Sequence, residues 1–348
     1  MGHTGAVQRL QKVDPTSPGI TRRRRGRGFS YEDEHGRPVR DREVLQRIRR
    51  LAVPPAWTDV WICPNPAGHL QASGTDAAGR RQPIYHEAWR RRQDLRKFQR
   101  VESFARSLPT MRPVIERDLA REGVPRERVM AAAVRLLDRG TFRIGSETYA
   151  DRNGSFGLAT IRKSHVQVEG PKLLFDYVAK GGARRLHEID DPMLVPLVEH
   201  LKRRRAGGVE LLAYREEGRW RDLRSGDINA YIKALLGEEH SAKDFRTWHA
   251  TVLAAVDIAG AQMQEATSRK RLIAATVRNV AEHMGNTPAV ARASYIDPRV
   301  FERFVQGRTL TPWLEKIETT DRQAAFELVE RAVLELLDCD AGQAVAAA

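Results

Sequence analysis

Apolar side chains recur at helical intervals over most of the chain beyond residue 90. The run RERVMAAAVRLL shows this spacing, because its apolar positions gather on one face of a helix. They are Val129, Met130, Ala133, Leu136 and Leu137. The run DRQAAFELVERAVLELLDCD predicts a further amphipathic helix from about Asp321 to Leu337, followed by a tail of small residues. These patterns indicate a mainly helical domain.

Two stretches depart from the helical pattern and predict strands. Between Tyr31 and Tyr85, apolar runs such as Val60-Trp61-Ile62 are short and bounded by Pro and Gly, which is typical of a small sheet. From Gly157 to Ile189, the run GLATIRKSHVQVEGPKLLFDYVAKGGARRLHEI predicts three short strands. The last two are joined at Lys180-Gly181-Gly182, which we interpret as a hairpin tip.

These patterns predict an α+β fold in two domains, which a chain of 348 residues is long enough to form. We expect a β-rich N-terminal domain over residues 31–90 and a mainly helical domain over residues 91–348 that carries a three-stranded sheet. Residues 1–30 have no periodicity and hold five Arg between positions 22 and 27. They predict a flexible basic arm.

Composition points to a polyanionic partner. The chain has 59 Lys and Arg against 45 Asp and Glu, a net charge of +14, and eight of the basic residues lie between Gly79 and Arg100. Nucleic acid is the first candidate. The sequence shows no long apolar run and no signal peptide, so we expect a cytoplasmic protein that associates with the nucleoid rather than a membrane. Cys63 and Cys339 are far apart, and predict neither a disulfide nor a zinc site.

The stretch AEHMGNTPAVARASYIDPRV carries unusually explicit helix boundaries. Gly285 is placed for a left-handed C-terminal cap, and Thr287-Pro288 and Asp297-Pro298 each fit the start of a helix. Asn286 then lies in a turn between two helices, and Tyr295 lies at the end of the short second one. Taken alone, a Tyr at such a place is usually a packing residue.

Three basic residues elsewhere are candidates for binding a phosphate. In SAKDFRTWHAT we expect Asp244 to cap a helix whose first turn contains Arg246, and a helix N-terminus with an Arg favours an anion. In GTFRIGSE, Arg143 lies between apolar residues at a predicted helix end, where its guanidinium needs solvent or an anion. Lys180 extends from the Gly-rich hairpin tip. Each has an ordinary alternative, a solvated surface residue.

Together these residues fit one reaction, the attack of a phenol on a phosphodiester. Two Arg and an Asn can donate hydrogen bonds to the non-bridging oxygens of the phosphate, whose negative charge grows in the transition state. A Lys can protonate the departing alkoxide. A Tyr with an ordinary pKa of ~10 is only about 0.1% ionised at pH 7, so nearby positive charge would help it react.

The ordered motifs FRIG, GLATIRKSHVQV, YVAKGGARRLHEI, KDFRTWHAT and MGNTPAVARASY closely resemble the catalytic domain of the type IB DNA topoisomerases, in particular the small poxvirus-like bacterial group. The run LAVPPAWTDVWICPNPAGHLQASGTDAAGRRQPIYH resembles their N-terminal domain. The resemblance spans about residues 31–306.

The resemblance implies a role for each residue of the candidate site. Tyr295 matches the nucleophile that joins the 3′ phosphate, and Arg143 and Arg246 match the arginines that clamp the scissile phosphate. Lys180 matches the general acid for the 5′ oxygen. Asn286 stands where the viral relatives have His in a Gly-His-Thr-Pro motif, so it implies an oxyanion donor without charge.

In the N-terminal domain, Gln82 and Tyr85 match positions that touch DNA in the viral enzyme. Pro83 stands where that relative has an aromatic contact residue, so the resemblance does not imply the viral cleavage-sequence preference for this chain. Arg80 and Arg81, like the basic residues from Arg90 to Arg100, are expected phosphate contacts.

The expected activity is relaxation of supercoiled duplex DNA by a monomer that clamps it, cuts one strand and rejoins it after rotation. One phosphodiester replaces another, so no ATP, cofactor or obligatory metal is implied. The sequence agrees, with no GxxxxGK[ST] motif and no acidic cluster for two metals.

Two alternatives remain open at this point. A tyrosine recombinase shares several of these motifs, but recombinases usually have His where this chain has Lys243, and they carry a helical N-terminal domain. A non-catalytic basic DNA-binding protein would explain the charge. It would not explain the ordered set of Arg143, Lys180, Arg246, Asn286 and Tyr295.

Overall fold

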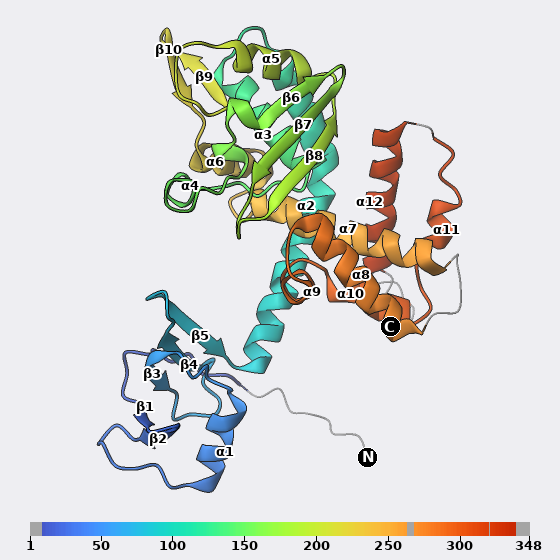
Figure 1. The fold of residues 1–348 in the computed structure, drawn as a ribbon. Helices are drawn as coiled ribbons and strands as arrows, with labels where there is room; N and C mark the ends of the chain where they lie inside the picture. Colours follow the sequence, from blue (N-terminus) through green and yellow to red (C-terminus); the bar gives the residue numbers. More distant parts are fainter. Residues whose placement is uncertain (1–8, 263–267, 320, 339–348) are drawn as a thin grey trace. The chain divides into compact units, whose positions relative to one another are not determined.

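The chain folds into two compact units, Met1–Lys97 and Phe98–Ala348. The computed structural model describes residues 9–262, 268–319 and 321–338. Figure 1 shows a small sheet-rich unit in the blue N-terminal part of the chain and mostly helices in the remainder. The α+β class expected from the sequence is confirmed.

Unit 1 is built on one antiparallel five-stranded sheet with the order β2-β1-β3-β4-β5. Its strands are β1 (Ile20–Arg25), β2 (Gly28–Glu32), β3 (Thr58–Ile62), β4 (Leu70–Thr75) and β5 (Arg81–Tyr85). Helix α1 (Arg42–Arg50) begins at Asp41, whose side chain accepts from the backbone N–H groups of Glu43 and Val44. Its buried Ile48 packs in a core with Ile20, Val60, Ile62 and Ala72. The strands expected between Tyr31 and Tyr85 are therefore confirmed.

The flexible basic arm expected over residues 1–30 is wrong for its second half. Residues 20–25 form β1, which pairs with β2 and β3, and residues 1–8 lie outside the described part of the chain. Arg22 explains why the Arg run is ordered. Its guanidinium donates to the carbonyls of Val53, Pro54 and Trp57 and lies 4.2 Å from the ring centroid of Phe29. The three carbonyl partners lie far away in sequence, so the run alone cannot reveal them.

Helix α2 (Glu87–Leu119) begins in unit 1 and continues into unit 2, and the domain boundary expected near residue 90 falls inside it. Its first two turns carry three consecutive exposed arginines, residues 90–92, whereas Phe98, Val101, Phe104 and Leu108 are buried. The change from a polar to an apolar helix therefore lies close to the division at Lys97 and Phe98.

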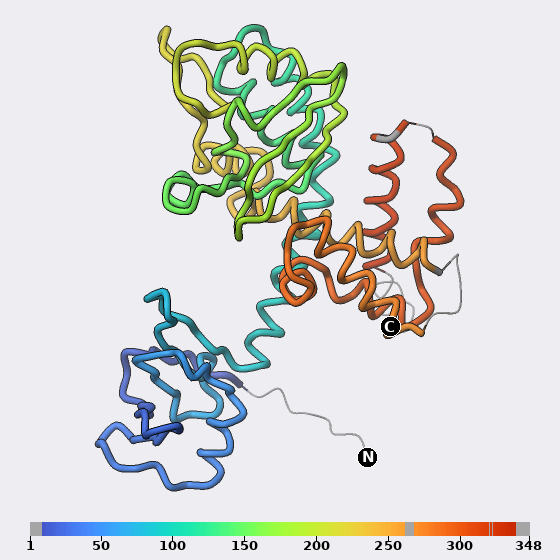
Figure 2. The backbone as a smooth tube through the Cα atoms, viewed as in Figure 1, coloured from blue at the N-terminus to red at the C-terminus, as the bar shows by residue number. Residues whose placement is uncertain are grey.

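Unit 2 contains the remaining helices and two small sheets, which the backbone trace in Figure 2 follows from teal to red. Its helices are α3 (Arg126–Arg139), α4 (Glu147–Asn153), α5 (Val195–Arg203), α6 (Ser225–Leu236), α7 (Ala242–Gln262), α8 (Arg269–Met284), α9 (Pro288–Ser294), α10 (Pro298–Val305), α11 (Thr311–Leu314) and α12 (Arg322–Asp338). Two 3₁₀ turns, η1 (Leu158–Thr160) and η2 (Lys163–His165), precede the larger sheet. The helices predicted around Val129 and near the C-terminus correspond to α3 and α12.

The larger sheet of unit 2 has the order β6-β7-β8, formed by β6 (Val166–Glu169), β7 (Lys172–Val178) and β8 (Arg184–Asp190), while β9 (Ala213–Glu216) and β10 (Arg219–Asp222) form a separate pair. The three strands expected over residues 157–189 are thus confirmed. Leu173, Phe175 and Tyr177 point into the core at alternate positions of β7. The β7–β8 turn carries Lys180, and both glycines after it have positive φ angles, 87° and 78°.

Within the described ranges, no helix is long and apolar enough to cross a membrane. Over the same residues, no group of three or more His, Cys, Asp or Glu side chains is placed to hold a metal ion. Cys63 is a buried free thiol, and Cys339 lies outside the described residues, as does the C-terminal tail of small residues.

Candidate active site

The end of helix α8 forms the turn on which the candidate site is built. Gly285 adopts the left-handed conformation (φ 61°), and its N–H donates to the carbonyls of Ala281 and Glu282. Thr287 accepts from the N–H of Val290 and begins α9, and Asp297 begins α10 in the same way. All three predicted helix boundaries are confirmed, and Asn286 lies in the turn between α8 and α9.

Three arginines from different elements bind consecutive carbonyls at this helix end. Arg185 donates to the carbonyls of Glu282 and His283, Arg246 donates to Met284 at 2.9 Å, and Arg143 donates to Gly285 at 2.8 Å. The last carbonyls of a helix have no partner within the helix and carry partial negative charge. The end of α8 thereby gathers positive charge from β8, α7 and the segment after α3.

The side chain of Asn286 has a fixed orientation. Arg143 donates to its amide oxygen, and since a guanidinium can only donate, the acceptor end of Asn286 must face Arg143. The amide nitrogen is buried and has no hydrogen-bond partner among the described residues. Asn286 therefore has an unused donor beside an arginine.

Arg246 is buried among positive charge. Only 4% of its surface is exposed, and it donates to the carbonyl of Thr141 as well as to Met284. Burial lowers the pKa of Arg246, and repulsion from Arg143 lowers it further, whereas its interaction with Tyr295 acts in the opposite direction. Its Nε is buried without a hydrogen-bond partner in the described chain. A guanidinium stays protonated in a protein, so this arrangement favours a bound anion.

Tyr295 ends α9 beside Arg246. The guanidinium carbon of Arg246 lies 5.4 Å from the centroid of the Tyr295 ring. The backbone around the ring is held by α7, because the Thr251 hydroxyl lies 3.3 Å from the Tyr295 carbonyl and accepts from the Asp297 N–H at 3.1 Å. The sequence did not single out Thr251, because its partner segment lies 44 residues away.

A second phenol lies near the same arginines. Tyr177 on β7 is 4% exposed, and burial raises its pKa to about 12 although Arg185, Arg246 and Arg143 attract the ionised form. A buried phenol that ionises less readily than usual is poorly suited to attack a phosphate. Tyr295, which is only half-buried, is the better placed of the two.

Two details of the predicted local structure are wrong. Arg143 is not on a helix end, because α3 ends at Arg139 and Arg143 lies in the irregular segment that follows. Asp244 does not cap α7 from outside; it lies within the first turn, where its carboxylate accepts from the N–H and hydroxyl of Ser241 and pairs with Arg100 at 3.0 Å. Ser241 precedes the helix, and the long-range partner Arg100 accounts for a fully buried Asp244.

Lys180 contacts a different element from the other predicted catalytic residues. Arg143, Arg246, Asn286 and Tyr295 meet at the end of α8 and α9, whereas the Lys180 ammonium lies 5.9 Å from the ring centroid of Tyr149 on α4. Lys180 is exposed at the tip of its hairpin. The structure thus brings four of the five predicted catalytic residues together.

The predicted DNA contacts of unit 1 lie on and beside the edge strand β5. Arg81 and Tyr85 alternate with Gln82, so Gln82 faces the other side of the strand. Gln82 and Arg80 both bind Asp76, whose pKa these hydrogen bonds lower to about 2. Arg81 donates to the Asp59 carbonyl and the Ser73 hydroxyl. The set is clustered, but it does not share one face.

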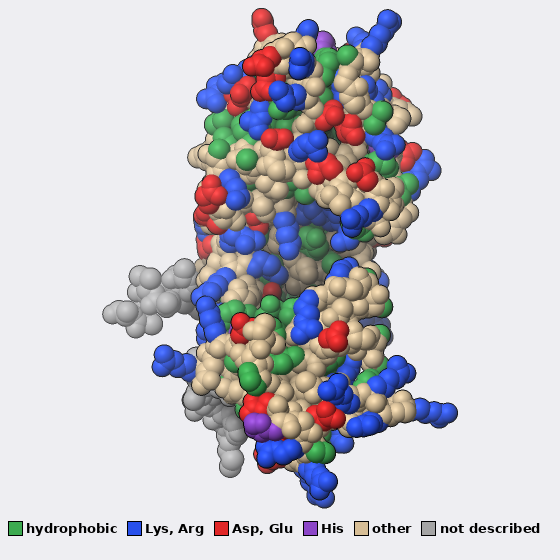
Figure 3. Space-filling view, turned by 90° about the vertical axis from the view of Figure 1, so that its left-hand side faces the viewer, with side chains coloured by type: hydrophobic (Ala, Val, Ile, Leu, Met, Phe, Trp, Pro, Cys, Tyr) green, Lys and Arg blue, Asp and Glu red, His purple; other side chains and the backbone are tan. Residues whose placement is uncertain are grey.

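Basic side chains are widely spread over the surface. In the view of Figure 3, Lys and Arg side chains lie over both units, with acidic side chains between them.

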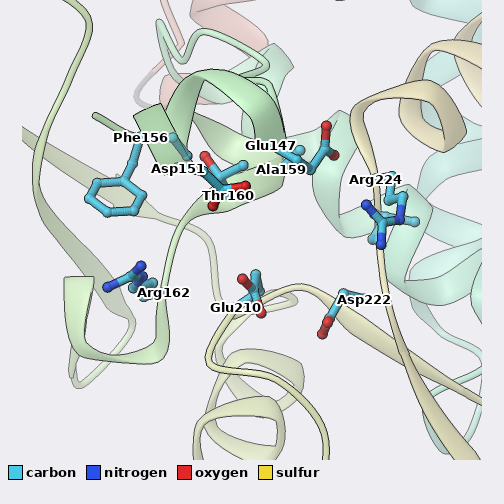
Figure 4. Close-up of a pocket in the computed structure, with 11 residues that line it drawn as sticks. Glu147, Asp151, Phe156, Ala159, Thr160, Arg162, Glu210, Asp222 and Arg224 are labelled. Carbon is cyan, nitrogen blue, oxygen red and sulfur yellow. The ribbon is translucent and has the colours of Figure 1, made fainter. Parts of the chain in front are cut away.

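One cavity of unit 2 is rich in acidic side chains. It has a volume of about 180 Å³ and lies beside α4, with Glu210 and Asp222 across from Glu147 and Asp151 (Figure 4). Burial and the neighbouring Glu210 raise the pKa of Asp222. Two arginines also line this cavity, at positions 162 and 224, but the four carboxylates outnumber them, so the end of α8 is better suited to a phosphate.

Comparison with known families identifies the family to which the chain belongs. The family described as "Eukaryotic DNA topoisomerase I, catalytic core" matches residues 86–310. The chain belongs to the type IB DNA topoisomerases. The family described as "Bacterial DNA topoisomerase IB, N-terminal domain" matches residues 28–76, which form most of the sheet of unit 1.

Individual relatives are also DNA topoisomerases. The chain is 28% identical to DNA topoisomerase 1B of Acanthamoeba polyphaga mimivirus over 286 residues, which is 80% of this chain and 85% of the viral protein. It is 26% identical to DNA topoisomerase 1 of Schizosaccharomyces pombe over 167 residues, 47% of this chain but only 19% of the yeast protein. As a type IB topoisomerase, the protein is an isomerase that binds DNA and changes its topology.

Proposed function

We propose that the protein relaxes supercoiled duplex DNA through a covalent bond between Tyr295 and a 3′ phosphate. The Tyr295 oxygen attacks the phosphorus and the bond to the 5′ oxygen breaks, so the strand is cut while the phosphodiester energy is kept. The free 5′ end rotates about the intact strand. Attack by the 5′ hydroxyl then restores the strand and releases Tyr295, without ATP or an obligatory metal.

The observation that carries this proposal is the set of unused donors beside a phenol. Arg246 Nε and Asn286 Nδ2 are buried without hydrogen-bond partners in the described chain, and Arg246 lies 5.4 Å from the Tyr295 ring centroid. Buried donors without partners are unfavourable, so the site is suited to an oxyanion that accepts from them. Positive charge from Arg143 and Arg246 would also favour the ionised phenol as the reaction begins.

Lys180 has the role of general acid in this proposal. A departing 5′ alkoxide is the anion of an alcohol with a pKa of ~16, so protonation in the transition state contributes strongly. The ammonium lies at the exposed tip of the β7–β8 hairpin, next to Tyr149. We propose that this tip moves to the 5′ oxygen when DNA binds, since the described contact of Lys180 is with α4.

Unit 1 is proposed to bind the same duplex. Arg81 and Tyr85 lie on the exposed side of β5, and the first two turns of α2 carry Arg90, Arg91 and Arg92. Such side chains suit phosphate contacts, which position a protein without reading sequence. A monomer holding duplex DNA in this way would bind less tightly as salt rises, because each contact releases counterions.

A plasmid assay tests this function directly. Negatively supercoiled DNA is incubated with the protein in EDTA without ATP, and stepwise relaxation is expected. Tyr295→Phe removes only the attacking oxygen and should abolish relaxation, whereas Tyr177→Phe removes the other hydroxyl near the arginines and should retain it. Relaxation by Tyr295→Phe, or none by well-folded wild type, would contradict the proposal. Exchange between two specific sites would indicate a recombinase instead.

A further inference from the structure

Arg185 is the arginine at the end of α8 to which the family resemblance gives no role. It lies on β8, five residues after Lys180, and its side chain faces inward on the strand. Its Nη1 donates to the Glu282 carbonyl at 3.0 Å, and its Nη2 donates to the carbonyl of His283. One side chain therefore ties the hairpin of the general acid to the helix that precedes Asn286.

The guanidinium of Arg185 also lies directly against Gly285. A Cβ atom added at Gly285 would stand 3.0 Å from Nη1 and 3.1 Å from Cζ of Arg185. Gly285 thus serves twice, because its φ of 61° ends the helix and its missing side chain makes room for the guanidinium. The turn that presents Asn286 is packed on Arg185.

The three arginines at this helix end are not equivalent. Arg143 and Arg246 are the proposed phosphate ligands, so their bonds to Gly285 and Met284 compete with the non-bridging oxygens of DNA. Arg185 binds the two carbonyls directly before these, those of Glu282 and His283. Its contacts can persist while the other two arginines shift toward the phosphate, and they place a positive charge at the negative C-terminal end of the helix.

We infer that Arg185 is a positioning residue for DNA cleavage, which holds the Asn286 turn and the Lys180 hairpin in register while Arg143 and Arg246 engage the phosphate. This inference rests on the proposed function. It assigns Arg185 no contact with DNA, so its loss slows the reaction of bound DNA and leaves binding itself unchanged. A displacement of about 1 Å in a catalytic group costs up to ~100-fold in rate.

The test is single-turnover cleavage of a nicked duplex by full-length Arg185→Ala, with Arg184→Ala as matched control. Arg184 is the adjacent residue, and its exposed side chain pairs with Asp176 on the outer face of the sheet. For Arg185→Ala, we expect a cleavage rate at saturating DNA about 10- to 100-fold lower with an unchanged half-saturating concentration. Arg184→Ala should stay within about twofold of wild type.

Two further variants separate positioning from general stability. Arg185→Lys keeps one cation that can reach a carbonyl, so it should recover part of the rate even if Arg185→Ala folds poorly. Combining Arg185→Ala with Asn286→Ala should cost less than the product of the single losses, because both act through the same turn.

Three results would overturn the inference. They are a wild-type rate for Arg185→Ala, a loss confined to DNA affinity, and losses that multiply fully with Asn286→Ala. Failure of the proposed function looks different, because wild-type protein would then form no covalent complex at all.

Discussion

Arg143 donates a hydrogen bond to the side-chain oxygen of Asn286, and this bond leaves the amide nitrogen of Asn286 as a buried donor without a partner in the described chain. The prediction is that Asn286→Ala slows DNA cleavage by roughly 10²–10³-fold, the usual loss for an oxyanion donor. Rapid-quench measurement of covalent complex formation gives this rate.

Asn286→Asp provides the matched comparison, because it keeps the size and the bond from Arg143 but replaces the free donor with a negative oxygen. It should be slower than Asn286→Ala, since a carboxylate repels the phosphate. Asn286→His should retain more activity than Asn286→Ala, because its ring can donate. If Asn286→Asp cleaves as fast as wild type, Asn286 is not a donor to the oxyanion.

Replacing Lys180 should matter only when the leaving group needs a proton. Lys180→Ala is expected to slow cleavage of ordinary DNA by about 10²–10⁴-fold. A thiol ionises far more readily than an alcohol, so a substrate with sulfur at the 5′ bridging position should be cleaved by Lys180→Ala at close to the wild-type rate. A matched control is Lys172→Ala at the other end of β7. Equal losses on both substrates would exclude Lys180 as the acid.

Thr251 on α7 should support the backbone of the nucleophile. Thr251→Val keeps the shape but removes the hydroxyl that accepts from the Asp297 N–H, which leaves a buried donor unpaired at a cost of about 1–3 kcal/mol. We expect lower stability and slower cleavage. Thr247→Val is the control, since among the described residues the Thr247 hydroxyl donates to the Lys243 carbonyl within α7 and makes no contact with the nucleophile segment. Equal cleavage rates for the two variants would contradict a role of Thr251 in supporting the nucleophile.

Arg112 should be essential to the stability of unit 2. It is 5% exposed and binds Asp138 at 2.9 Å and Glu330 at 2.7 Å, while Glu330 also accepts from the Trp248 ring. Arg112→Met leaves both carboxylates uncompensated and should lower the free energy of unfolding by about 3–5 kcal/mol. The exposed Arg117→Ala should cost no more than about 1 kcal/mol. Equal urea midpoints for these variants would contradict this.

Mild acid should destabilise unit 2 through His249. Burial lowers its pKa to about 4, against an ordinary value near 6.5. Between these pH values the unfolded chain binds the proton and the folded chain does not. The free energy of unfolding therefore keeps its full value above pH 6.5, as far as His249 is concerned, and falls as the pH drops below it. From pH 7 to pH 5 this histidine contributes a loss of about 2 kcal/mol.

His249→Asn removes the titrating ring, and urea unfolding at the two pH values should then show a smaller difference than wild type. His187, whose pKa burial lowers to about 3, acts in the same direction and stays in both proteins. An identical pH dependence in wild type and His249→Asn would show that the pKa of His249 is the same in the folded and the unfolded chain, which contradicts this prediction.

The parts of the site that were predicted from sequence depend on local rules. Gly285, Thr287 and Asp297 bind backbone groups within a few residues, so their caps can be recognised in the sequence itself. The Lys180 hairpin is also local, because its tip needs two glycines with positive φ. Helical stripes and alternating strands likewise reflect burial along one element.

The parts that were missed depend on contacts between distant segments. Arg185 lies in the run ARRLHEI, but its contacts are with the carbonyls of Glu282 and His283, which lie 97 and 98 residues further along the chain. The only sequence signal was strand alternation, which places it on the same side as the buried Ile189. Arg22 looked like part of a solvated arm because its carbonyl partners lie more than 30 residues further on.

Identification of the residue that joins DNA tests the central claim most directly. A nicked duplex is used from which cleavage releases a short downstream fragment with a free 5′ hydroxyl, so that the strand cannot be rejoined. The covalent complex is then stopped in denaturant and digested, and mass spectrometry locates the residue that carries the nucleotide. The account predicts one modified peptide, carrying a 3′-linked phosphate on Tyr295. An adduct on Tyr177 or another residue, or a phosphate linked through the 5′ end, would contradict it.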